Sequence, residues 1–174
     1  MSSNRDRFGV RLSILDRITG LNPDKARSNT VRRDSPPTIG DLRATVHRDL
    51  SVLLNTRRSD EPIPMEFTEA FSSLLTYGLP DFTGCSALDR SEQERFRREI
   101  ETAIRLFEPR LADVTVSLDR PAAKDARSKP GETALRYHVR ALLRVEPEPE
   151  PVYFDAVLEP GTGRVDLQTP QSRR

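Results

Sequence analysis

The spacing of apolar residues changes near the middle of the chain, and this change constrains the fold more than any other feature. Before residue 108, apolar side chains recur every three or four positions, which is the period of an amphipathic helix. From residue 114 onwards they alternate with polar side chains, which is the period of a half-buried strand. Helices and strands in separate runs predict an α+β domain.

Three helices are expected before the period changes. Gly78 follows the second apolar stripe and is expected to cap the end of that helix. Ser91 and Glu94 have the spacing of a capping box, which marks the start of the third helix. The third helix should end before Pro109, because a residue that precedes proline disfavours the helical conformation. The predicted helices cover residues 39–57, 65–76 and 91–107.

Short strands are expected in the rest of the chain. A hairpin loop is predicted at residues 120–132, and the Glu-Pro repeat at 146–151 is expected to be extended and solvated. We therefore expect three N-terminal helices packed on one face of a C-terminal antiparallel sheet of three to four strands. The last strand is short, so the sheet should have an edge that another chain could extend. The predicted strands cover residues 114–118, 133–145, 152–158 and 164–167.

The domain organisation follows from composition. Residues 1–38 are predicted to be a flexible N-terminal arm, residues 39–168 a single α+β domain, and residues 169–174 a disordered tail. The arm contains a short amphipathic segment at 10–18, which is too short to be a stable helix alone. This segment is therefore expected to dock on the domain or on a partner. Its apolar residues are Leu12, Ile14, Leu15 and Ile18.

Charge is distributed unevenly along the chain, although the formal net charge is only +1. Residues 1–58 contain twelve Arg or Lys against six Asp, a net of +6, so the remaining residues carry −5. This asymmetry favours docking on an acidic partner surface or self-complementary assembly. Nucleic acid is not an expected partner, because no basic face is interleaved with aromatic residues.

A cytoplasmic location without membrane insertion is expected. The first residues are polar and charged, with no apolar core of a signal peptide. No stretch approaches the roughly 18 apolar residues that a membrane span requires. Cys85 is the only cysteine, which excludes an internal disulfide and a thiolate metal cage.

The sequence does not favour an enzyme, a metal site or a cofactor. His47 and His138 are too few for a metal triad, and no glycine-rich phosphate loop or nucleophile elbow is present. The alternative is a peptidoglycan-degrading glycosidase that uses Glu108 with Glu101 or Asp113. With no Trp and only three Tyr, the chain offers little aromatic surface on which a sugar could stack.

Two segments are candidates for binding a partner. The first is Glu108-Pro109-Arg110, where opposite charges flank a proline at the junction of the third helix and the first strand. The second is the polar end of the first helix, where Asn55, Arg57 and Arg58 lie beyond the apolar stripe. The simpler interpretations are a helix-to-strand connector with solvated charges and an ordinary basic helix end.

Five segments in this order resemble the TssE family of type VI secretion baseplate subunits, which are similar to the wedge proteins of contractile phage tails. Each segment alone is weakly specific, but together they extend from about residue 13 to residue 167. Ile14 and Ile18 stand where the family pattern has Leu. The segments are Ser13–Ile18, Arg48–Arg58, Tyr77–Asp81, Glu108–Arg110 and the turn at Gly161–Gly163.

The resemblance implies a structural role rather than a catalytic one. TssE-like proteins assemble with TssF, TssG and TssK into a cytoplasmic platform, from which the sheath of TssB and TssC polymerises. The family motif Glu-Pro-Arg, here Glu108, Pro109 and Arg110, is expected to anchor the subunit to its neighbours. The C-terminal sheet is expected to receive strands from the first sheath ring.

Overall fold

The computed structural model describes residues 38–59, 61–83, 89–119, 134–159 and 161–169. The predicted N-terminal arm, the loop at 120–132 and the C-terminal tail lie outside the described residues, apart from Thr38 and Thr169. None of the helices in the described ranges is long and apolar enough to cross a membrane.

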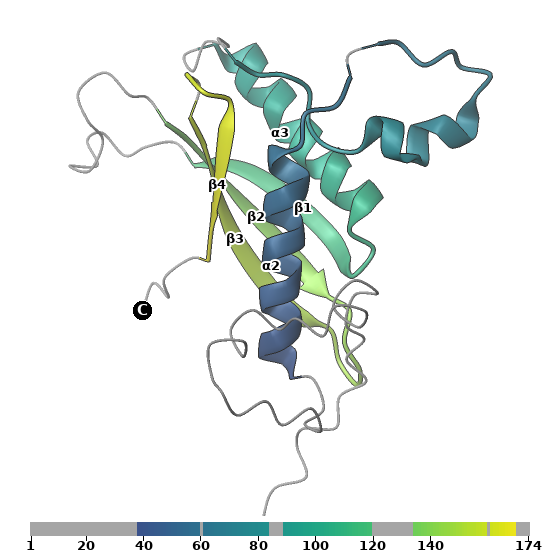
Figure 1. Ribbon diagram of the computed structural model, residues 1–174. Coiled ribbons are helices and arrows are strands. Elements are labelled where there is room, and N and C mark those ends of the chain that lie inside the picture. Colours follow the sequence, from purple (N-terminus) through teal and green to yellow (C-terminus); the bar gives the residue numbers. More distant parts are fainter. Residues whose placement is uncertain (1–37, 60, 84–88, 120–133, 160, 170–174) are drawn as a thin grey trace, which may run out of the picture.

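A four-stranded antiparallel sheet with helices on one face forms the domain (Figure 1). The strands are in sequence order across the sheet, so each is joined to the next as a meander. Helix α2 lies against β4 and helix α3 against β1, at opposite sides of the same face. The α+β prediction is confirmed. The elements are α2 (Ile39–Asn55), α3 (Arg90–Phe107), β1 (Leu111–Asp119), β2 (Leu135–Leu143), β3 (Glu150–Glu159) and β4 (Arg164–Gln168).

The prediction of three helices is wrong for the described part of the chain, which has two α-helices. Residues 65–76 form two short 3-10 turns instead, η1 (Thr68–Ser72) and η2 (Leu74–Thr76). None of their residues is buried, so the apolar stripe lacks the packing that stabilises a short helix. Ser73 and Thr76 also donate their hydroxyls to the Ala70 and Phe71 carbonyls, which competes with helical bonding.

Both α-helices begin at residues whose side chains cap them. Thr38 and Asp41 form a reciprocal capping box at α2, with Thr38 Oγ1 accepting from the Asp41 amide. Helix α3 starts slightly earlier than predicted, because Asp89 is its cap and accepts from both the amide and the hydroxyl of Ser91. The predicted box between Ser91 and Glu94 is therefore not the cap. The predicted end of α3 at Glu108 is confirmed.

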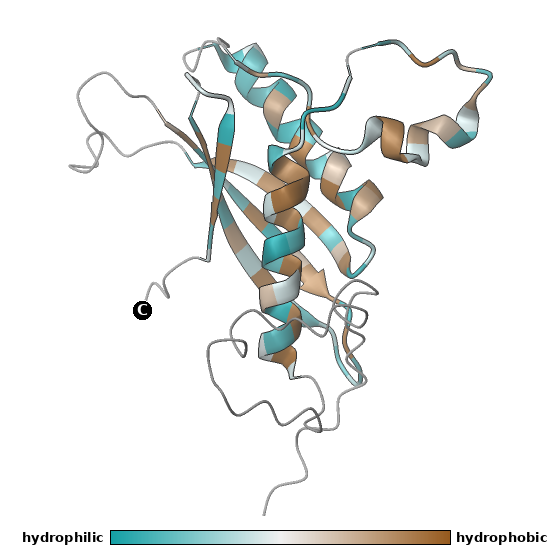
Figure 2. Ribbon diagram, in the orientation of Figure 1, coloured by the Kyte–Doolittle hydropathy of each residue, from teal (hydrophilic) through white to brown (hydrophobic). Residues whose placement is uncertain are grey.

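The core lies between the helices and the inner face of the sheet. Alternate residues of β2 are buried, as its period of two predicts. Tyr137 is fully buried at the centre, where its ring lies 5.1 Å from that of Phe96 and its hydroxyl donates to the Gln93 carbonyl. Figure 2 shows that apolar residues recur along both helices and along the strands. Leu50 of α2 and Ile100 of α3 are among the buried ones.

Gly78 has a different role from the predicted helix cap. The chain returns from η2 to cross the end of α2, where the Leu79 amide donates to the Thr56 carbonyl and the Arg58 amide donates to the Leu79 carbonyl. Gly78 has φ +108°, and a Cβ at this position would lie 2.2 Å from the Thr56 oxygen. Only glycine fits this close backbone approach.

Candidate partner-binding site

Glu108 is buried at the junction between α3 and β1. It ends the helix with its own amide bonded to the Ile104 carbonyl, and its carbonyl accepts from the Leu111 amide as the strand begins. Pro109 between them is exposed and fixes the turn. The Glu108 side chain is 5% exposed, so its carboxylate requires a charged partner nearby.

Arg110 supplies that partner and also connects the junction to α2. Its Nε donates to Glu108 Oε1 at 2.6 Å and its Nη2 to Oε2 at 2.5 Å, an arrangement in which both carboxylate oxygens are held. The same Nη2 lies 2.7 Å from Asp49 Oδ2 on α2. Arg48 then donates from Nε and Nη2 to the other oxygen of Asp49. We call these four residues, Arg48, Asp49, Glu108 and Arg110, the charged cluster.

Hydrogen bonds in the charged cluster favour the ionised form of Arg110. Burial alone lowers the pKa of Arg110, but its hydrogen bonds to Glu108 and Asp49 outweigh this effect and raise the pKa above its usual range. Burial, followed by the negative charges of Asp49 and Glu108, raises the pKa of the Tyr77 hydroxyl. The Tyr77 ring packs edge-on against Phe107, the residue that precedes Glu108.

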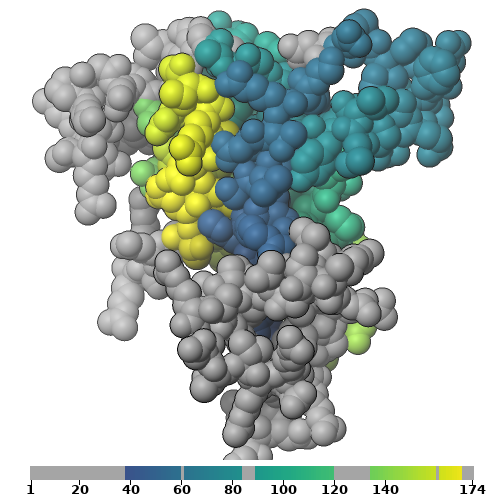
Figure 3. Space-filling view, viewed as in Figure 1, coloured from purple at the N-terminus to yellow at the C-terminus, as the bar shows by residue number. Residues whose placement is uncertain are grey.

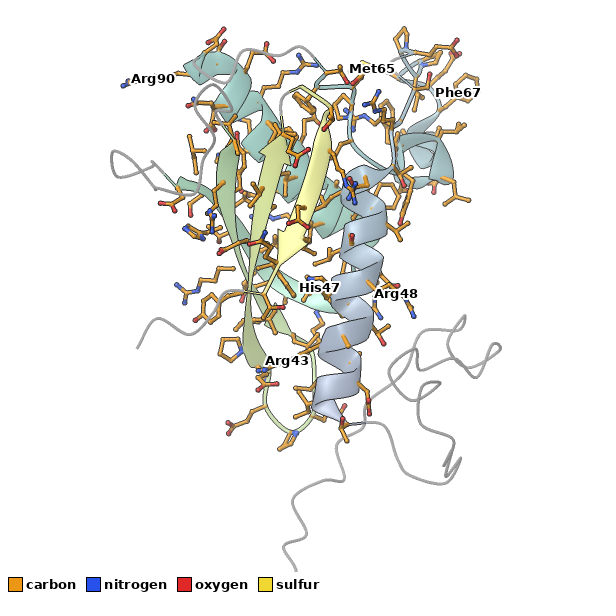
Figure 4. The ribbon with its side chains drawn as sticks, turned by 60° about the vertical axis from the view of Figure 1, so that its left-hand side comes forward. Arg43, His47, Arg48, Met65, Phe67 and Arg90 are labelled. Carbon is orange, nitrogen blue, oxygen red and sulfur yellow. The ribbon has the colours of Figure 1, made fainter. Side chains whose placement is uncertain are left out.

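The charged cluster has a buried end and an exposed end. Side-chain exposure rises from 5% at Glu108 to 22% at Arg110, 30% at Asp49 and 36% at Arg48. Among the described residues, Arg110 Nη1 is buried without a hydrogen-bond partner. The buried end joins three elements of the fold, and the more exposed end lies on α2 (Figure 4 labels Arg48).

Asn55, Arg57 and Arg58 are not gathered into this cluster, and each makes contacts within the domain. Asn55 bonds both the amide and the carbonyl of Val165 on β4. Arg57 donates to the Thr162 carbonyl and to Asp81, which ties the β3–β4 turn to the loop after Gly78. Arg58 pairs with Glu99 on α3. Asn55 is the last residue of α2, whereas Arg57 and Arg58 lie beyond its end, although residues up to 57 were predicted to be helical.

The prediction of a free edge at β4 is wrong for the described residues. The Asn55 amide group occupies the outer edge of the strand at Val165, and His47 Nε2 donates to the Leu167 carbonyl at 3.0 Å. The opposite edge is guarded similarly, since Arg97 and Arg105 of α3 donate to the Val116 and Val114 carbonyls of β1. Side chains of the helices thus satisfy backbone groups at both edges.

The carboxylates considered for glycoside hydrolysis are engaged in other contacts. Both oxygens of Glu108 accept from Arg110, and Glu101 pairs with Arg97 and Arg105. Asp113 lies at a bulge in β1, where its φ of +51° accompanies a one-residue shift in the pairing with β2. The geometry therefore gives no support to this pairing of acids.

Asp49, Arg48 and Tyr77 were missing from the predicted site residues. All three belong to segments that carry the TssE resemblance, but spacing along the chain does not indicate that α2 meets the Glu108–Arg110 junction. Asp49 and Arg110, which form the ion pair, are 61 residues apart in the sequence. The sequence signal for Asp49 was its place in the segment Arg48–Arg58.

The sequence matches the family described as baseplate wedge protein gp25 over residues 40–148, which is more than half of the chain. The chain belongs to this family, which includes TssE. The match supports a structural role in a baseplate.

The chain is also similar to the anti-adapter protein IraD of Salmonella arizonae. The two sequences are 36% identical over 81 residues, which cover 47% of this chain and 57% of IraD. The chain therefore spans little more than half the length of that relative.

Proposed function

We propose that this chain is the wedge subunit of a type VI secretion baseplate in the cytoplasm. It assembles with TssF, TssG and TssK, and the sheath of TssB and TssC begins to polymerise on the resulting platform. The observation that carries the proposal is the family match over residues 40–148. This range includes α3, β1, β2 and all of α2 except Ile39, and hence every residue of the charged cluster.

In this proposal the exposed end of the charged cluster contacts a neighbouring subunit. Arg48, Asp49 and exposed Pro109 present opposite charges beside a rigid turn, which suits orientation and specificity more than raw affinity. Glu108 acts indirectly, by holding Arg110 against Asp49.

Addition of a sheath strand at β4 requires a rearrangement. An incoming strand must first displace Asn55 and His47 from the outer edge of β4. The two side chains are then a gate that keeps the edge from pairing before a sheath strand arrives.

The proposal is tested by deleting the gene in its own host and following fluorescent TssB in living cells. No sheath should form without the chain, and expression of the wild-type chain should restore sheaths. Affinity purification of the chain should recover TssF and TssG. Normal sheath formation in the deletion strain would refute the proposal.

A further inference from the structure

The segment between Glu61 and Thr76 exposes an unusual amount of apolar surface. It protrudes from the body of the molecule beside α3 (Figure 3), and Figure 4 shows Met65 and Phe67 pointing away from the sheet. Exposure reaches 89% at Met65 and 84% at Leu74. Five of the eight large apolar side chains exposed in the described ranges lie here: Met65, Phe67, Phe71, Leu74 and Leu75.

The same segment is acidic. Between residues 59 and 76 the sequence has four Asp or Glu and no Arg or Lys, a net of −4. Glu61, Glu66 and Glu69 are exposed, and no ion pair within the described ranges involves them. We call residues 61–76 the acidic lobe. An apolar surface with unneutralised negative charge fits a partner that is apolar and basic.

Local hydrogen bonds give the acidic lobe its shape, because it has no core of its own. Ser72, Ser73 and Thr76 donate their hydroxyls to carbonyls of the lobe, and Ser73 Oγ also accepts from the Leu75 amide. The apolar side chains are therefore held outward by a folded backbone. Left uncovered in a free subunit, such a surface favours aggregation.

The N-terminal arm has the complementary chemistry. Residues 1–37 contain eight Arg or Lys against four Asp, a net of +4, opposite in sign to the lobe. Within the arm, the segment at 10–18 has Arg11 and Arg17 against Asp16, a net of +1, among its apolar residues. This segment is apolar and weakly basic, and it belongs to a basic arm, whereas the lobe is apolar and acidic.

The arm is long enough to reach the acidic lobe of its own chain. It joins the N-terminal end of α2, whereas the lobe begins just after the C-terminal end. A helix of 17 residues is about 25 Å long. The roughly 20 residues between Ile18 and Thr38 reach up to about 66 Å when extended. Contact within one chain also benefits from a high effective concentration.

We propose that residues 10–18 dock their apolar side chains on the acidic lobe of the same chain, with Arg11 and Arg17 facing its glutamates. The contact covers the lobe in the free subunit. This inference is independent of the secretion system in which the subunit acts, since it concerns two segments of one polypeptide.

Amide hydrogen exchange on the full-length chain tests the proposal. Amides of residues 65–76 should exchange about 10-fold faster in the double variant Ile14→Glu/Leu15→Glu than in the wild type, because the cover is lost. The matched control Leu21→Glu changes an arm residue outside the segment and should behave as wild type. Exchange in β2 reports whether each variant is folded.

A second double variant tests how much the opposite charges contribute to the contact. Glu66→Lys/Glu69→Lys should also accelerate exchange in the lobe, and it should expose amides at 10–18. Equal exchange of the lobe in wild type and Ile14→Glu/Leu15→Glu would overturn the proposal. Protection that disappears on dilution would overturn it as well, since a second copy would then be the occupant.

Discussion

Arg110 and Asp49 form an ion pair between the start of β1 and the middle of α2, with Nη2 2.7 Å from Oδ2. Because Glu108 holds the same guanidinium from the other side, a buried carboxylate and a half-exposed one share a single cation. The Glu-Pro-Arg segment is therefore a structural junction whose outer end remains accessible. This division predicts different consequences for substitutions at its two ends.

Loss of the buried carboxylate should weaken the fold. Glu108→Ala leaves Arg110 partly buried with Asp49 alone, so the free energy of unfolding should fall by about 3 kcal/mol. Glu108→Gln keeps an acceptor for Arg110 and should cost less. Urea unfolding followed by circular dichroism measures both. A loss below about 1 kcal/mol for Glu108→Ala would mean that the junction does not depend on this ion pair.

The crossing of Gly78 over the end of α2 leaves no room for a side chain. Gly78→Ala should lower the free energy of unfolding by more than about 1 kcal/mol, because it combines a positive φ with a clash against the Thr56 carbonyl. Gly161→Ala is a suitable control, since nothing lies within 4 Å of its added Cβ. Equal stability of the two variants in thermal unfolding would contradict the assigned role.

Asn55 should guard the β4 edge as well as stabilise it. Asn55→Ala removes the partner of the Val165 amide and carbonyl, and the expected loss is about 1–2 kcal/mol. The freed edge should also increase self-association, which analytical ultracentrifugation detects. Gln168→Ala on the same strand removes only a contact with Asp166 and should change neither property. An Asn55→Ala variant that stays monomeric would argue against the gate.

Acid should destabilise the domain partly through α3. Hydrogen bonds from Arg97 and Arg98 lower the pKa of Glu94 from 4.5 to about 2. A lowered carboxyl pKa stabilises the fold above the unfolded value and loses that contribution as the pH falls from about 4.5 toward 2. Glu94→Gln should therefore flatten this part of the stability profile, measured by urea unfolding at several pH values. Glu148→Gln, which alters an exposed residue outside the lobe and without an ion pair in the described ranges, should leave the profile unchanged.

Much of the fold is predictable from the sequence, because the spacing of apolar residues predicts which side chains are buried. Alternation places Tyr137 and Val139 in the core, and the stripes of α2 and α3 point inward as expected. The stripe at 65–76 has the same period but faces solvent, since periodicity reports which residues could share a face and not whether anything covers that face. Hydrogen bonds from local hydroxyl groups to backbone carbonyls then favour 3-10 turns over an α-helix in this segment.

The site is less predictable than the fold. Glu108 and Arg110 are neighbours in sequence, so their pairing is accessible from the pattern, but the contact with Asp49 depends on how α2 crosses the end of α3. Asn55 illustrates the same limit. Its polar position beyond the stripe suggested a free contact residue, whereas the tertiary fold places it on the edge of β4.

The exposed end of the charged cluster carries the central claim, and Arg48→Ala in living cells tests it most directly. Arg48 forms a partly exposed pair, so its loss should cost at most about 1 kcal/mol of stability. Arg43→Ala is the matched control, because Arg43 lies on the same helix and pairs with Glu150. Fluorescent TssB should form markedly fewer sheaths with Arg48→Ala and normal numbers with Arg43→Ala, while both purified proteins stay folded. Normal sheath numbers with a folded Arg48→Ala protein would contradict the account.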